Sequence, residues 1–231
     1  LLALASVAAA TAALGETHPS HRRIAPSVGS ILGGYLSLLK NPIFLAYSLT
    51  VATATGIFFA FITGAPGFLI GRYQIPPDIY GFYAASMPVG FISGNFISSL
   101  VSRRLGITRT IFTGLAISFA AGLALLTASL DGSFSTVGFV APMFFFGISA
   151  GLLVPSCFAG ALGANPRLAG MASGLSGFLQ MGAAAVATTV VGALDHGSLL
   201  PYALMLFSMA VLSSVLFLSL WGLNRIRGAA A

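Results

Sequence analysis

The stretch from Thr136 to Leu162, TVGFVAPMFFFGISAGLLVPSCFAGAL, contains no charged residue and is long enough to cross a lipid bilayer. A transmembrane helix needs roughly 20 apolar residues, and the hydrocarbon core offers no water to satisfy backbone groups outside a helix. Similar stretches occupy residues 42–70, 80–101, 108–130, 168–194 and 199–223. The sequence therefore predicts an all-α membrane protein, built as a bundle of six transmembrane helices.

The composition supports this class. Of 231 residues, 57% are hydrophobic and 6% are charged, against roughly 25% charged residues in soluble domains. The net charge of +6 comes from scattered basic residues and not from a basic stripe with interleaved aromatics, so we expect the lipid bilayer as a partner and no nucleic acid. Cys157, the single cysteine, lies within a span, which excludes a disulfide framework.

The basic residues also predict how the spans are oriented. Nine of the ten Lys and Arg residues fall in alternate gaps between the spans, and Arg72 is the exception. Cytoplasmic loops of membrane proteins retain Lys and Arg. We therefore expect both ends of this chain to face the cytoplasm.

Ionisable residues are absent from the interior of all six predicted spans. A proton-coupled transporter needs an ionisable group at membrane depth. Either a proton site lies in a part of the protein outside these spans, or the protein is not coupled to protons.

Polar and aromatic residues within the spans are the candidates for a substrate cavity. Asn95 and Gln180 must either hydrogen-bond across helices or line a wet cavity. Ser173, Ser176 and Gln180 recur on one helical face, and the phenylalanines cluster in two runs that would suit an uncharged, lipophilic ligand. The candidate cavity residues are Gln180, Asn95, Ser173, Ser176, Phe58, Phe61 and Phe145.

Small residues and prolines within the spans indicate close packing and local kinks. Three pairs have the Gly-x-x-x-Gly spacing that lets helix backbones approach in membranes. The candidate packing or gating residues are Gly90, Gly94, Gly147, Gly151, Gly170, Gly174 and Pro66.

No enzyme chemistry is supported. Gly174-Leu175-Ser176-Gly177 matches the serine string of intramembrane proteases, but the only later histidine, His196, lies in a loop and cannot activate the serine. His18 and His21 lack a third ligand, so we expect no metal site. We expect no cofactor either.

Several stretches together resemble a known transporter family. They are Tyr35 to Tyr47, Phe61 to Pro66 with Tyr80-Gly81, and above all Ala169 to Met181. These segments are similar to the C-terminal half of a Major Facilitator Superfamily transporter, and more narrowly to the Bcr/CflA type of drug:proton antiporter. Arg103, Arg104, Gly106 and Arg109 lie where this family repeats its cytoplasmic loop motif, although the usual Asp is missing.

The resemblance implies a domain plan and a function. Residues 1–14 would end a truncated sixth helix, 15–41 would form a cytoplasmic linker with an interfacial helix, 42–223 the transporter half and 224–231 a cytoplasmic tail. The implied function is efflux of lipophilic drug-like compounds against protons in a bacterial inner membrane, together with an N-terminal six-helix half. The alternatives are import of a metabolite and a non-transporting membrane subunit.

Overall fold

A computed structural model describes residues 27–130, 135–194 and 198–229. The predictions for residues 1–14, for His18, His21 and His196, and for the first part of the linker lie outside the described residues. The elements are α2 (Val28–Leu39), α3 (Pro42–Pro66), the π-helix η2 (Gly67–Arg72), α4 (Pro77–Ala84), α5 (Ser86–Leu105), α6 (Ile107–Leu130), α7 (Thr136–Gly163), the 3-10 helix η3 (Pro166–Leu168), α8 (Ala169–Ala193) and α9 (Leu200–Ala229).

The prediction of six all-α membrane spans is confirmed. Six helical segments are long and apolar enough to cross a bilayer, and their bounds lie within a few residues of the predicted ones. The last helix extends to Ala229, so helix continues through most of the segment predicted as a separate tail.

The second span differs from the sequence expectation because it is interrupted at Ala85, between α4 and α5. Pro88 follows three residues later and has no N–H to donate to the carbonyl one turn earlier. The N–H of Val89 still reaches the Ala85 oxygen at 2.9 Å, so α5 starts cleanly after the break.

Side-chain caps define where two of the spans begin. The Asn41 Oδ1 accepts hydrogen bonds from the backbone N–H groups of Ile43 and Phe44, at 2.9 and 3.2 Å, and Pro42 occupies the first helical position. The Ser135 Oγ accepts from the N–H of Gly138 at 3.0 Å. These residues satisfy N–H groups that have no partner within the helix.

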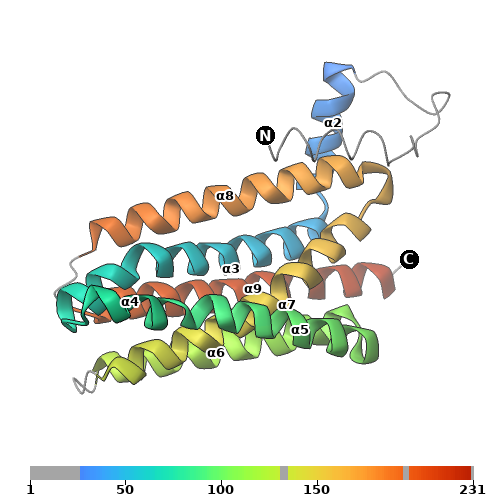
Figure 1. The fold of residues 1–231 in the computed structure, drawn as a ribbon. Helices are drawn as coiled ribbons and strands as arrows, with labels where there is room; N and C mark the ends of the chain where they lie inside the picture. The colour runs from blue at the N-terminus through green and yellow to red at the C-terminus, as the bar shows by residue number, and fades with distance from the viewer. Residues whose placement is uncertain (1–26, 131–134, 195–197, 230–231) are drawn as a thin grey trace, which may run out of the picture. The chain divides into compact units, whose positions relative to one another are not determined.

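Helix α3 lies at the centre of the bundle. It packs against α7, α8 and α9, while α7 also packs against α5 and α6. Figure 1 shows α8 running alongside α3 on one side of the bundle, with α6 on the opposite side. Within its most hydrophobic window α3 is 61% buried, against 22% for α8. A span in the middle of the bundle has few side chains left for lipid, and α3 contributes buried residues along most of its length.

The largest apolar core contains a group of packed aromatic side chains. Phe61, Phe68, Phe139 and Tyr202 are each at most 2% exposed and belong to one cluster. The Phe68 and Tyr202 ring centroids are 4.9 Å apart. This cluster joins α3, η2, α7 and α9 and holds the bundle together around the site described below.

Candidate functional site

Glycines let α5 and α7 meet backbone to backbone. A Cβ at Gly90 would collide with the carbonyl oxygen of Phe144, and a Cβ at Gly147 with that of Met87. The same holds for Gly94 against the Ile148 oxygen. Two of the three predicted Gly-x-x-x-Gly pairs therefore face each other, with Gly151 lying against the backbone of Phe91 to Asn95.

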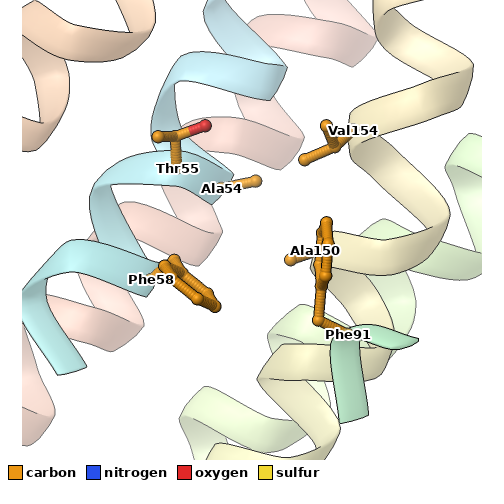
Figure 2. Close-up of a pocket in the computed structure, with 6 residues that line it drawn as sticks. All are labelled: Ala54, Thr55, Phe58, Phe91, Ala150 and Val154. Atoms are coloured by element: carbon orange, nitrogen blue, oxygen red, sulfur yellow. The ribbon is translucent and has the colours of Figure 1, made fainter. Parts of the chain in front are cut away.

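This crossing brings Phe91 of α5 close to α3 and to α7, where a small pocket lies. The pocket has a volume of about 180 Å³ and is lined by Ala54, Thr55, Phe58, Phe91, Ala150 and Val154. Figure 2 shows Phe58 and Phe91 reaching into the same space from different helices. We call it the aromatic pocket.

The two rings of the aromatic pocket form its walls. The ring centroids of Phe58 and Phe91 are 6.0 Å apart and the ring planes are inclined by 58°, within the range in which aromatic side chains attract each other. The one polar side chain in the lining is Thr55, whose hydroxyl lies 2.9 Å from the Val51 carbonyl oxygen and 3.2 Å from the Gln180 Oε1. Because that hydroxyl is already engaged, the pocket presents an apolar surface.

Two of the predicted cavity residues join α8 to α3. The Ser176 side chain is buried and its Oγ lies 2.8 Å from the Oγ of Ser48. Gln180 is partly buried, accepts from Thr55 and donates from its Nε2 to the Ser176 carbonyl at 3.2 Å. Of the two roles left open for Gln180, the structure shows hydrogen bonding across helices, next to a residue of the pocket.

The remaining cavity candidates lie elsewhere, and Asn95 lines a separate pocket between α5 and α7. Phe61 is 2% exposed and packs in the core, with its ring centroid 6.4 Å from that of Phe139. Phe145 is 50% exposed and lines a different pocket, between α6 and α7. Ser173 is partly exposed on α8 and is not among the pocket-lining residues. Of the three candidate phenylalanines, only Phe58 lines the aromatic pocket.

The prediction of close helix packing has to be corrected for the third glycine pair, Gly170 and Gly174. The position of a Cβ at Gly170 has no atom within 4 Å, and that at Gly174 has only the Tyr35 Oη, at 3.8 Å. No described helix backbone approaches either residue, so close packing is wrong for this pair within the described part of the chain. Pro66 ends α3, where the backbone continues as the π-helix η2.

The residues of the predicted loop motif lie at the turn from α5 to α6. Gly106 ends α5 with φ of +81° and ψ of 162°, a conformation that is essentially restricted to glycine. Arg103 and Arg104 are exposed in the last turn of α5, where positive charge is favourable at a helix C-terminus. Arg109 is also exposed, near the start of α6.

Sequence reasoning missed most of the lining of the aromatic pocket. Thr55, Phe91, Ala150 and Val154 gave no signal of their own, because each is an ordinary residue in an apolar span. Phe91 could have been found from its place between Gly90 and Gly94, since a side chain beside a close helix crossing is held in a fixed position. Among the described residues, no three His, Cys, Asp or Glu side chains gather as metal ligands would.

The comparisons with known proteins agree with this architecture. Residues 1–188 match the family model described as Major Facilitator Superfamily. The chain is 30% identical to a "Bicyclomycin resistance protein homolog" of Haemophilus influenzae, over 84% of this chain and 48% of that protein. It is 27% identical to an "Uncharacterized MFS-type transporter YdgK" of Bacillus subtilis, over 90% of this chain and 51% of the relative.

The chain thus spans about half the length of the curated relatives it matches. Its six apolar helices are those of a multi-pass membrane protein, and the similarity to a bicyclomycin resistance homologue fits the narrower Bcr/CflA resemblance. With more than half of its residues matched by the family model, the chain belongs to the Major Facilitator Superfamily of transporters.

Proposed function

We propose that this chain is one six-helix half of a secondary transporter that exports small lipophilic compounds from bacteria in exchange for protons. The half moves against an N-terminal six-helix half, so that a site between them opens to each side of the inner membrane in turn. The name of the Haemophilus relative, a bicyclomycin resistance protein homolog, supports export of an antibiotic-like compound over other transported molecules.

The aromatic pocket is the observation that carries this proposal. Its lining presents two phenylalanine rings, small aliphatic groups and a threonine whose hydroxyl is already hydrogen-bonded. Such a surface binds a ligand by dispersion and ring contacts, and the ligand needs no charge to bind. Its volume of about 180 Å³ is below the roughly 300–1,000 Å³ of complete ligand sites, so this half supplies one wall of the site and the other half the rest.

Proton coupling is assigned to the other half. The six spans of this chain hold no Asp, Glu or His in their interior, and a proton carrier at membrane depth requires such a group. In this proposal the present half contributes to the substrate-binding site, and the N-terminal half carries the group that binds and releases the proton.

The test is transport by the intact protein in a bacterium that lacks its own efflux pumps. We expect a neutral lipophilic dye to accumulate less when the protein is present, and a protonophore to abolish the difference. Phe58→Ala and Phe91→Ala should each reduce efflux at unchanged expression, because each removes one wall of the pocket. Phe145→Ala is the matched control, because that ring lies in another pocket.

Other outcomes would point to the alternatives. Accumulation that rises when the protein is present indicates import. No effect on any probe, with the protein correctly inserted, indicates a non-transporting membrane subunit. Equal loss of efflux in Phe145→Ala and Phe58→Ala would remove the aromatic pocket from the mechanism.

Gln180 has an indirect role in this proposal. Its Oε1 lies 3.2 Å from the Thr55 hydroxyl, which also lies 2.9 Å from the Val51 carbonyl oxygen, so Gln180 is one of two acceptors beside that hydroxyl. We expect Gln180→Ala to reduce efflux less than Phe58→Ala does; unchanged efflux at normal expression would exclude the role.

A further inference from the structure

The two rings of the aromatic pocket meet as a wedge and not as parallel plates. The ring planes of Phe58 and Phe91 are inclined by 58°, and their centroids are 6.0 Å apart. Carbon atoms in contact lie about 3.5–4.0 Å apart, so a flat ring held between two parallel rings needs them roughly 7–8 Å apart. The wedge is too narrow and too inclined for such a sandwich. A group that contacts both ring faces therefore needs thickness as well as breadth.

The backbone of Phe91 is held against α7, which limits how far this wall of the wedge can move. A Cβ at Gly151 would collide with the carbonyl oxygen of Phe91, and a Cβ at Gly147 would lie 2.9 Å from its backbone nitrogen. The Phe91 ring can thus change its inclination only by rotating about its own side-chain bonds, which favour a few staggered positions.

The other wall, Phe58, has a second aromatic neighbour. Its ring centroid lies 6.1 Å from that of Phe59, with the planes inclined by 71°, an edge-to-face contact of the kind that aromatic side chains favour. Phe58 therefore has aromatic contacts to both Phe59 and Phe91, which stabilise the observed orientation of its ring.

The rest of the wedge is lined mainly by small side chains. Ala54 of α3 and Ala150 of α7 both line the pocket and are only 5% and 3% exposed. Figure 2 shows them on opposite helices, beside the two rings. A larger apolar side chain at either position would occupy part of the space that is now open, so these two alanines determine how deeply a ligand group can enter.

We infer that the aromatic pocket selects a compact, three-dimensional apolar group over a flat fused-ring group, and that Ala54 and Ala150 determine the depth to which it enters. This inference rests on the proposed function and narrows its substrate class by shape. A caged or branched hydrocarbon presents C–H groups to both ring faces at once, and dispersion grows with the number of atoms in contact. A flat group can lie against one ring only.

The test measures the binding of two neutral amides to the purified intact protein. Adamantane-1-carboxamide and naphthalene-2-carboxamide have the same number of carbon atoms and the same amide, but the first is a compact cage and the second a flat plate. The parent should bind the adamantane amide roughly tenfold more tightly. That ratio corresponds to about 1.4 kcal/mol, or fewer than two additional buried methylene groups.

Ala150→Val tests the depth of the pocket. The added methyl groups should weaken binding of the adamantane amide by roughly threefold to tenfold and change binding of the naphthalene amide by less than about twofold, because the flat group does not enter as far. Ala54→Val makes the same change from α3 and serves if Ala150→Val lowers the unfolding temperature. Ala116→Val is the matched control, since Ala116 is exposed on α6 and is not part of the aromatic pocket; it should match the parent for both amides.

Phe91→Ala tests the wedge itself. Without this ring the remaining wall is Phe58, against which a flat group can stack. The affinities for the two amides should then differ by less than about twofold. Phe145→Ala, whose ring lies in another pocket, should keep the preference of the parent.

Several results would overturn the inference while leaving the proposed function in place. They are a parent that exports a lipophilic dye but prefers the naphthalene amide, binds both amides equally or binds neither. Equal weakening of both amides in Ala150→Val and Ala54→Val, or an unchanged preference in Phe91→Ala, would also overturn it. A parent that exports no lipophilic probe at all would instead count against the proposed function itself, and the selection by shape would fall with it.

Discussion

Phe58 of α3 and Phe91 of α5 face each other across the aromatic pocket, with ring centroids 6.0 Å apart. Their separation depends on the glycine contact between α5 and α7, because Phe91 lies between Gly90 and Gly94 in the sequence. A packing motif thus positions a side chain that lines the aromatic pocket. Changes at the crossing should affect both the stability of the bundle and the shape of the pocket.

Gly94→Ala should destabilise the protein. A Cβ at this position would collide with the carbonyl oxygen of Ile148, and backbone cannot rotate away as a side chain can, so we expect a loss of roughly 1–3 kcal/mol of unfolding free energy. Thermal unfolding of the detergent-solubilised protein measures it. Gly170→Ala is the control, since its Cβ would meet no atom within 4 Å; equal unfolding temperatures for the two variants would contradict the observed crossing.

Ser48→Ala and Ser176→Ala should lose the same interaction. Their hydroxyls are 2.8 Å apart between α3 and α8 and both are buried. Side-chain hydrogen bonds between membrane helices contribute about 0.6 kcal/mol on average. A double-mutant cycle should give a coupling energy of about that size.

The control for this cycle is Ser173→Ala combined with Ser48→Ala. Ser173 is a partly exposed serine on the same helix as Ser176. The changes in unfolding free energy should simply add for this pair. Additivity in the Ser48 and Ser176 cycle as well would mean that the hydroxyls do not interact.

Gly106→Ala should strain the turn between α5 and α6. Its φ of +81° with ψ of 162° is costly for any residue with a Cβ, by roughly 1–3 kcal/mol. Gly163→Ala at the end of α7 is the matched control, since its Cβ would meet nothing within 4 Å and its φ is outside the left-handed range. A Gly106→Ala variant as stable as Gly163→Ala would rule out this backbone conformation.

The helix α2 should lie at the membrane surface. Val28, Leu32, Leu36 and Leu39 form an exposed apolar stripe on it, with exposures of 45 to 74%, and it ends just before the first span. A short helix with one apolar face binds the boundary between headgroups and acyl chains. In a Trp221→Phe background, Leu36→Trp fluorescence should be quenched by brominated lipids.

Ser37→Trp provides the comparison, because Ser37 is exposed and lies away from the apolar stripe on the same helix. Its fluorescence should be quenched much less. Similar quenching at both positions would show that α2 is not oriented on the membrane in this way.

The six spans could be predicted because hydropathy and span length are local properties of the sequence. The aromatic pocket could not, since α3 is apolar on every side and its pattern does not separate Phe58 from Phe61. The structure turns Phe61 into the core against Phe139 and leaves Phe58 at the pocket. Similarly, the Gly-x-x-x-Gly spacing of Gly170 and Gly174 is the same as that of Gly90 and Gly94, but only the second pair meets a helix.

The sequence by itself determined the number of spans, their helical form and the lack of a buried ionisable group. A bilayer excludes water and charge regardless of how the helices pack against one another. Only the tertiary structure decided which glycines cross and which rings meet. It also decided that Gln180 reaches Thr55. These are contacts between helices far apart in the chain, and in a uniformly apolar medium they follow from close packing and hydrogen bonds between particular side chains.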